Sequence, residues 1–281
     1  SIYILKRMIR RDFIKTSSQA ALLLALSPSL ACASNNTYKK NMGIQLWTLK
    51  DLLADNPKNV LSQLSSIGFS YIEGFEGSQG LFWGMPSKDF GTFLNNNNLN
   101  MPSAHCNWES DLEKKAEQMA TIGGKYLICP YVGPQPSLDH FKTLAEKFNK
   151  AGEVCRSFGL KFAYHNHDYS FIPVDEVLPQ DLLMKHTDPS LVDFEMDLYW
   201  LDVANVNILE FLKTHQQRIN LLHIKDRKIN NDQHSETCTL GEGSISYEKI
   251  LNEVKNLPIK YFIYEQEHFS DKGIIHDVSI G

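Results

Sequence analysis

Short apolar runs alternate with helical patterns of apolar residues from Gly43 towards the end of the chain. The apolar runs predict strands at eight segments: 43–47, 71–75, 101–106, 126–129, 162–165, 192–196, 220–224 and 261–265. Apolar residues at helical spacing predict helices between them, at 57–67, 87–94, 112–122, 138–158, 206–214 and 247–254. Because strands and helices alternate without an internal linker, the pattern predicts an α/β fold, the (β/α)₈ TIM barrel.

A doubly wound parallel sheet is the structural competitor. No Gly-x-Gly-x-x-Gly follows the first strand, which removes the usual reason to prefer that fold. After the eighth strand only residues 266–281 remain, and they contain the helix breaker Gly273 without a clear helical period. The helix that would close the barrel is therefore expected to be missing or truncated.

The first 36 residues have the pattern of an export signal rather than of a domain. Arg10 and Arg11 precede an apolar run at 20–26 and small residues at 31–34, in an order resembling bacterial twin-arginine signals. The apolar run is too short for a stable membrane span. We therefore expect residues 1–36 to be a signal, residues 42–281 to be the barrel, and the protein to be periplasmic. A lipoprotein anchor at Cys32 and an amphipathic helix are the alternatives.

Composition and charge exclude several other classes. The 281 residues are 42% hydrophobic, which is ordinary for a globular core. A net charge of −5 without a basic stripe argues against nucleic acid as a partner. The five cysteines form no Cys-x-x-Cys pair, so neither a zinc ribbon nor a disulfide framework is indicated. Homo-oligomerisation stays open.

Polar side chains cluster where the predicted strands end. The carboxyl ends of barrel strands meet at one mouth, where the working residues of such barrels lie. The ends collected here are Gln45, Trp47, Glu73, Glu76, His105, Asn107, His165, His167, Asp197, His223, Lys225, Glu265 and Glu267. Imidazole and carboxylate ligands without thiolates favour one divalent ion of the Mn, Co, Zn or Mg group.

Four segments carry a resemblance to a known family. They are Tyr164–Tyr169 (YHNHDY), Met196–Trp200 (MDLYW), Leu222–Asp226 (LHIKD) and Tyr264–Glu267 (YEQE). In this order they resemble the xylose-isomerase-like sugar phosphate isomerase/epimerase family. The resemblance implies a TIM barrel that binds one divalent metal through Glu, Asp, His and Glu from its last four strands.

Carried over onto this sequence, the family's ligands match at three strands. Asp197, His223 and Glu265 match the ligands of the sixth, seventh and eighth strands, while His165 stands where the family has a glutamate. Family epimerases use two metal-bound glutamates as an acid and base pair, and one of them is replaced here. A subgroup with the His-Asn-His motif carries a further glutamate at the position of Ser170.

The resemblance also implies roles in proton transfer beside a metal-polarised carbonyl. Glu265 is the candidate base, and Lys225 would stabilise the developing oxyanion. Glu73 or Glu76 would be the second acid or base. The substrate-binding candidates are Trp47, Glu76, His105 and His167. The plainer interpretations are a salt bridge of Lys225 with Asp226 or another neighbour, and hydrogen-bonding rim roles for Glu73 and Glu76.

These observations predict a metal-dependent isomerase or epimerase of a small sugar or keto-sugar, with a hydroxypyruvate-isomerase-like activity included. An exported enzyme meets few phosphorylated sugars, so we expect an unphosphorylated substrate. A lyase or dehydratase acting on a keto-sugar or keto-inositol is the first alternative, because elimination also begins with proton removal next to a carbonyl. A non-catalytic sugar-binding barrel is the second.

Overall fold

The computed structural model describes residues 42–230, 232 and 234–281. The predicted export signal at 1–36, with Cys32, lies outside these residues. The described strands close a barrel in the order β1-β10-β7-β6-β5-β4-β3-β2, and every pair is parallel. They are β1 (Met42–Gln45), β2 (Tyr71–Phe75), β3 (Asn100–His105), β4 (Tyr126–Cys129), β5 (Lys161–His165), β6 (Val192–Asp197), β7 (Ile219–Ile224) and β10 (Tyr261–Tyr264). The predicted (β/α)₈ barrel is confirmed.

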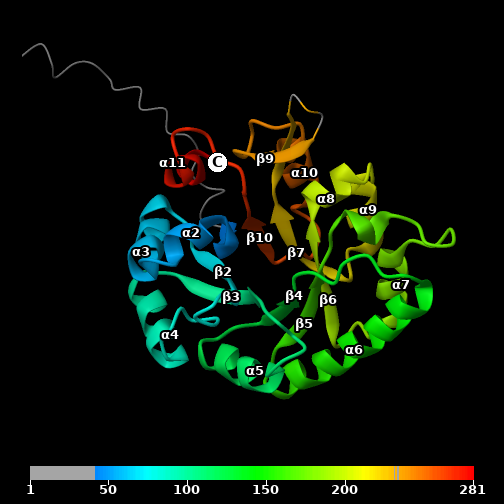
Figure 1. Ribbon diagram of the computed structural model, residues 1–281, viewed down its shortest axis with the longest axis horizontal. Helices are drawn as coiled ribbons and strands as arrows, with labels where there is room; N and C mark the ends of the chain where they lie inside the picture. The colour runs from blue at the N-terminus through cyan, green and yellow to red at the C-terminus, as the bar shows by residue number, and fades with distance from the viewer. Residues whose placement is uncertain (1–41, 231, 233) are drawn as a thin grey trace, which may run out of the picture. The chain divides into compact units, whose positions relative to one another are not determined.

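Helices curve around the outside of the strands (Figure 1). The described helices and helical turns are η2 (Leu46–Leu49), α2 (Lys50–Leu53), α3 (Pro57–Ile67), α4 (Ser87–Asn96), α5 (Leu112–Thr121), α6 (Leu138–Ser157), η3 (Asp168–Phe171), α7 (Pro179–His186), α8 (Leu198–Val203), α9 (Ile208–His215), α10 (Tyr247–Val254) and α11 (Ile274–Ile280). All six predicted helices are present. The closing helix α11 is present and has 7 residues.

The helix α3 shows how local sequence signals set its ends. The Asn56 side chain accepts a hydrogen bond from the N–H of Asn59, and Pro57 occupies the first turn, where its missing N–H costs nothing. Gly68 ends the helix with φ of 117°, a left-handed conformation that favours glycine. Its buried face, Val60, Leu61 and Leu64, packs into the main core.

The apolar core divides into two parts because successive side chains along a strand point to opposite faces. The larger part includes Ile44, Ile72 and Phe194, together with the buried faces of the helices. A small separate cluster contains Tyr71, Tyr126, Ile128, Ala163, Leu221 and Ile263. Two positions after members of this cluster, His223 lies on β7 and Glu265 directly follows β10. The alternation that builds the small cluster therefore also places polar side chains at the strand ends.

An antiparallel hairpin follows β7. It consists of β8 (Asp226–Ile229) and β9 (Ser235–Cys238). The buried Asp226 carboxylate accepts hydrogen bonds from the N–H groups of Gly241 and Gly243 at 2.9 and 3.0 Å. The segment after the hairpin is thereby fixed against the end of β7. Within residues 42–230, 232 and 234–281, no helix has the length and apolar composition needed to cross a membrane.

Candidate active site

A cavity of about 590 Å³ lies at the carboxyl ends of the barrel strands. Its aromatic lining comprises Trp47, Phe75, Trp108, Tyr131 and Trp200. Its ionisable lining comprises Glu76, His105, Glu109, His165, His167, Lys225, Glu265 and Glu267. The volume falls within the range of about 300–1,000 Å³ typical of small-molecule sites. The predicted mouth is therefore a real cavity with mixed aromatic and charged walls.

The three predicted ligands from β6, β7 and the end of β10 converge. One donor atom each from Asp197, His223 and Glu265 lies within 4.8 Å of the others, and all three side chains are buried. The Nδ1 atom of His223 is 3.0 Å from Oε2 of Glu265. The spatial convergence that the metal hypothesis requires is therefore present; we call these three residues the mouth triad.

The end of β6 orients Asp197 towards the cavity. Its Oδ1 atom accepts hydrogen bonds from the N–H groups of Tyr199 and Trp200 and so caps α8. Its Oδ2 atom is buried and has no hydrogen-bond partner among the described residues. Since a buried polar atom without a partner is costly, this oxygen has the environment expected of a metal ligand.

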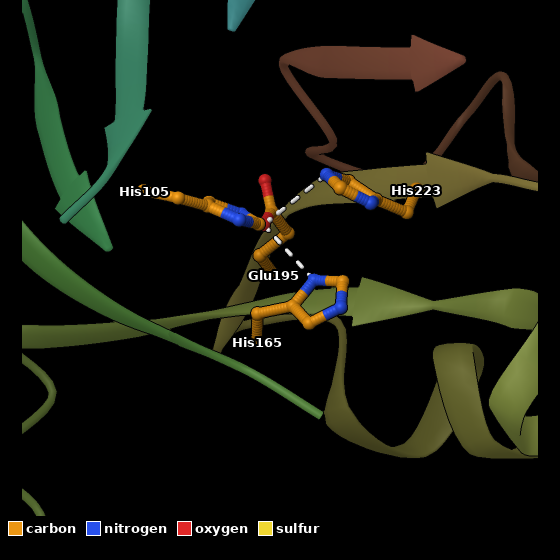
Figure 2. A group of neighbouring side chains, drawn as sticks. All are labelled: His105, His165, Glu195 and His223. Atoms are coloured by element: carbon orange, nitrogen blue, oxygen red, sulfur yellow. Dashed lines mark hydrogen bonds and ion pairs between the residues drawn. The ribbon is translucent and has the colours of Figure 1, made fainter. Parts of the chain in front are cut away.

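Below the mouth triad, a buried glutamate of β6 is surrounded by histidines. The Oε2 atom of Glu195 lies 2.7 Å from Nε2 of His105, 3.1 Å from Nδ1 of His165 and 3.3 Å from Nε2 of His223 (Figure 2). Donor atoms of these four residues also lie within 4.8 Å of one another. The strand-end pattern assigned no role to Glu195, although this residue is two positions before Asp197 and therefore faces the same side of β6.

A second buried glutamate, Glu73 of β2, supports the same group. Its Oε1 atom lies 2.8 Å from Nε2 of His223 and 3.1 Å from Nε2 of His105. Its carboxylate accepts hydrogen bonds from Gln45 at 2.7 Å and Ser103 at 2.5 Å. Glu73 is fully buried and is not part of the cavity lining. A catalytic contact between Glu73 and a substrate, as predicted, has no support in this arrangement.

Lys225 places its ammonium group among carboxylates at the mouth. Its Nζ atom is 2.6 Å from Oε1 of Glu267, 3.1 Å from Oε2 of Glu265 and 3.8 Å from Oδ2 of Asp197. The Asp226 carboxylate instead accepts hydrogen bonds from the loop after the hairpin, so the plainer salt bridge of Lys225 is formed with the neighbouring glutamates and not with Asp226. Lys225 lines the cavity, where a cation can stabilise negative charge.

Burial and charge shift the carboxyl groups in opposite directions. Burial raises the pKa of Asp197 to about 6, and burial with the Glu73 carboxylate raises that of Glu195 to about 7. Burial would also raise the pKa of Glu265, but the ammonium of Lys225 and the imidazoles of His223 and His105 together outweigh it and hold this pKa well below its usual range. Glu265 is therefore ionised at neutral pH.

The imidazoles divide in the same way. Burial lowers the pKa of His165 well below its usual range and that of His167 to about 3. Burial opposes the charged forms of His105 and His223 as well, but neighbouring carboxylates outweigh it and raise the pKa of His105 to about 9 and that of His223 well above its usual range. His165 and His167 are therefore neutral imidazoles that can accept a bond at one nitrogen.

The remaining predicted residues line the cavity, but they differ in whether their polar atoms already have protein partners. Trp47 is 41% exposed, and His167 has a buried Nδ1 atom without a hydrogen-bond partner in the described part of the chain. Glu76 is engaged, because its Oε2 atom lies 2.8 Å from Nζ of Lys115 and accepts the N–H of Asn107. Aromatic lining residues such as Tyr131 were missed, because loop aromatics carry no distinctive spacing.

The residues present fit a divalent ion. Nε2 of His165 lies 3.7 Å from the unpartnered Oδ2 of Asp197, and Nδ1 of His223 lies 3.0 Å from Oε2 of Glu265. Such separations suit neighbouring ligands of one ion with bonds of about 2.0–2.2 Å. Asp197, His223 and Glu265 therefore fit an ion as they stand, whereas His165, the fourth predicted ligand, approaches them only through Asp197 and would have to move towards the other two to join them.

Comparisons with known proteins agree with this fold. An inosose dehydratase from Bacillus licheniformis is 28% identical over 131 residues, which cover 45% of this chain and 43% of that protein. The chain thus aligns with less than half the length of that curated relative. A sugar phosphate isomerase/epimerase from Parabacteroides distasonis is 25% identical with a TM-score of 0.74, covering 90% of this chain and 96% of that one.

Two further findings concern the family. The IOLI protein, whose structure contains a zinc atom, shares 12% identity and a TM-score of 0.67 over 85% of this chain and 95% of its own, which shows a common fold alone. A sequence profile described as the xylose isomerase-like TIM barrel matches residues 61–278. The strand-end motifs, the closed parallel barrel and this match together show that the chain belongs to the xylose isomerase-like TIM barrel family.

Proposed function

We propose that this protein is a metal-dependent enzyme that removes the proton next to the carbonyl of a neutral keto-sugar and then eliminates water. The observation that carries the proposal is the convergence of Asp197, His223 and Glu265 beside Lys225 at one cavity. Inosose dehydratases are among the relatives of this chain, which supports elimination as the outcome.

The charges around the cavity support a neutral substrate. In the described part of the chain, the lining contains four glutamates and one lysine, and no arginine. That lysine, Lys225, is already paired with Glu265 and Glu267. Since phosphate recognition relies on arginine, lysine or a helix N-terminus, such a cavity would repel a phosphorylated sugar. Trp47 and Trp108 supply apolar surface for the C–H faces of a sugar ring.

The proposed reaction uses few groups of the chain. Asp197, His223 and Glu265 would hold a divalent ion, which would supply Lewis acidity to the substrate carbonyl and make the adjacent C–H bond more acidic. Glu265, which is ionised, accepts that proton, and the ammonium of Lys225 lies close enough to stabilise the enolate oxygen. The protonated Glu265 would then return that proton to the departing β-hydroxyl as the enolate collapses, which forms the carbon–carbon double bond, releases water and regenerates the carboxylate.

Isomerisation or epimerisation is the second candidate, and the similarity to the Parabacteroides isomerase/epimerase favours it. Epimerisation by two acid/base groups needs a second group on the opposite face of the substrate carbon. The two glutamates expected there are engaged: Glu73 is buried outside the cavity lining, and Glu76 is bound by Lys115. Elimination needs only one base, and this difference supports the lyase.

NMR in heavy water on a panel of neutral keto-sugars and keto-inositols tests the proposal. Elimination gives a dehydrated product, whereas isomerisation exchanges a carbon-bound proton without loss of water. Glu265→Gln is expected to lower kcat by about 10²–10⁴-fold, because it removes the base. Glu153→Gln, on the exposed face of α6, is the matched control. Undiminished turnover in Glu265→Gln would refute the assignment of the base. A metal-free protein that binds these sugars without converting any of them would favour the sugar-binding barrel.

A further inference from the structure

The imidazole of His165 is held by a buried carboxylate on one side and faces the cavity on the other. Its Nδ1 atom lies 3.1 Å from Oε2 of Glu195. Its Nε2 atom lies 3.7 Å from Oδ2 of Asp197, the oxygen that has no hydrogen-bond partner in the described structure. An imidazole that donates Nδ1–H to a carboxylate leaves the Nε2 lone pair free for an ion, which is the usual arrangement of a metal-ligating histidine.

The imidazole of His223 repeats this arrangement with its nitrogens exchanged. Its Nε2 atom is 2.8 Å from Oε1 of Glu73, and its Nδ1 atom is 3.0 Å from Oε2 of Glu265. Glu73 is itself fixed by Gln45 and Ser103, and all of these side chains lie in the barrel interior at under 10% exposure. A rigid glutamate therefore determines which nitrogen of His223 faces the mouth.

We propose that this centre selects a transition ion of the Zn²⁺, Co²⁺ and Fe²⁺ group over Mg²⁺. His165 sets the preference, and Glu73 and Glu195 position the two ligating imidazoles. Two imidazole nitrogens and two carboxylate oxygens suit these ions, whereas Mg²⁺ takes oxygen ligands. The inference rests on the proposed function, since it places the ion at the mouth triad with His165.

A deeper position for the ion is the rival arrangement. Donor atoms of His105, His165, Glu195 and His223 also lie within 4.8 Å of one another. Carboxylates already contact these nitrogens, because Oε2 of Glu195 lies within hydrogen-bond distance of all three rings and Glu73 of two. Oε1 of Glu195 is buried without a partner among the described residues, as Oδ2 of Asp197 is, so the two positions must be separated by experiment. The deep position would give the ion three imidazoles, whereas the mouth position gives it two.

X-ray absorption at the metal edge of the Zn²⁺- or Co²⁺-loaded wild-type protein distinguishes these positions without any substitution. We expect two imidazoles per ion, one ion per chain by elemental analysis, and retention of Co²⁺ against a large excess of Mg²⁺. Asp197→Asn should lose the ion, and His105→Gln should keep it. Three imidazoles, with the ion retained in Asp197→Asn and lost in His105→Gln, would overturn the proposal.

Variants test the selectivity and the positioning residues. His165→Glu adds an oxygen ligand, so it should strengthen Mn²⁺ and Mg²⁺ binding relative to Zn²⁺. The control is His167→Gln, because His167 is two residues away and belongs to neither donor group. This control should leave the metal preference unchanged. Glu195→Gln and Glu73→Gln should each weaken Co²⁺ binding by about 10–100-fold. Competition with a chromophoric chelator measures these affinities, and circular dichroism of the metal-free variants confirms folding. Folded variants with unchanged affinity would refute the positioning roles.

These measurements need no substrate, so this inference and the proposed function can fail separately. A protein that binds Co²⁺ through two imidazoles but converts no keto-sugar would leave the metal assignment standing and remove the proposed reaction. Turnover supported by Mg²⁺ alone, with no retention of Co²⁺, would do the reverse.

Discussion

Ser170 stands where a subgroup of the family carries a glutamate, and the structure places it away from the mouth. It is fully buried in η3, and its Oγ atom lies 2.9 Å from the hydroxyl oxygen of Tyr164. Tyr164 belongs to the main core. The serine therefore satisfies a buried hydroxyl, and its departure from the motif removes no ligand from the cavity.

Restoring the glutamate should harm the fold rather than rebuild a site. Ser170→Glu puts a carboxyl group beside the core tyrosine, and it should lower the free energy of unfolding by at least about 2 kcal/mol. Urea unfolding measures the change, with Ser170→Ala as the control for loss of the hydroxyl alone. A Ser170→Glu variant that is as stable as the wild type and binds metal more tightly would contradict this placement.

Gly243 lies against the carboxylate that anchors the loop after the hairpin. A Cβ atom there would lie 2.1 Å from Oδ1 of Asp226 and 2.6 Å from the carbonyl oxygen of Arg227. Both are held in place, so Gly243→Ala should cost about 1–3 kcal/mol of stability. Thermal unfolding is the measurement, and Glu242→Ala, on the exposed neighbouring position, is the control. Equal stabilities of the two variants would show that the loop can shift freely.

Sequence spacing predicted the candidate ligands at strand ends but missed Glu195, one of the residues that contact them. Asp197 and His223 directly end buried runs, so they could be recognised one strand at a time. Glu195 has the right phase on β6, but its role depends on histidines from three other strands, β3, β5 and β7. No single-strand pattern contains that information, because it arises only when the barrel closes.

At the scale of elements, the strands were predicted nearly to the residue, and the short helices were not. Asp197 is both the last residue of β6 and the N-cap of α8. No polar loop separates the strand from this helix of 6 residues, so the sequence pattern did not indicate where the helix begins. The helix α7 and the hairpin of β8 and β9 were missed for the same reason, since each is too short to show a period. The long helix α6, with 20 residues, was clear.

The closing helix α11 should depend on pH through Asp277. Its oxygens accept hydrogen bonds from the N–H and the hydroxyl of Ser270, both at 2.6 Å. Burial would raise the pKa of Asp277, but these bonds outweigh it and lower the pKa. The folded pKa is thus below the unfolded value of about 3.9, so the stabilisation is present above that value and is lost as pH falls through the folded pKa.

Asp277→Asn should therefore be less stable than the wild type at neutral pH, and the difference should shrink in acid. Urea unfolding at pH steps from about 7 down to about 2 tests this expectation. Asp271→Asn, an exposed carboxylate nearby, is the control and should show little difference at any pH. A stability difference that is constant with pH would show that Asp277 stabilises the helix by its packing and not by its charge.

At the scale of the whole molecule, we propose that residues 1–36 direct export by the twin-arginine route. The double variant Arg10→Lys/Arg11→Lys should retain the protein in the cytoplasm of a bacterial host, because the route reads the paired arginines. Cell fractionation measures this distribution, with Arg7→Lys as the control and Cys32→Ser as the test of a lipid anchor. Equal export of the double variant and the wild type would exclude this route.

The two oxygens of Asp197 have separate tasks, since Oδ1 holds the first turn of α8 and Oδ2 faces the cavity. An amide at this position keeps an acceptor for the turn but loses the charge, and a longer carboxylate keeps the charge but misplaces the acceptor. Folding and catalysis therefore each restrict which residue can stand at position 197. A saturation library scored separately for folding and turnover should find this position intolerant in both screens, with asparagine among the few survivors of the first alone.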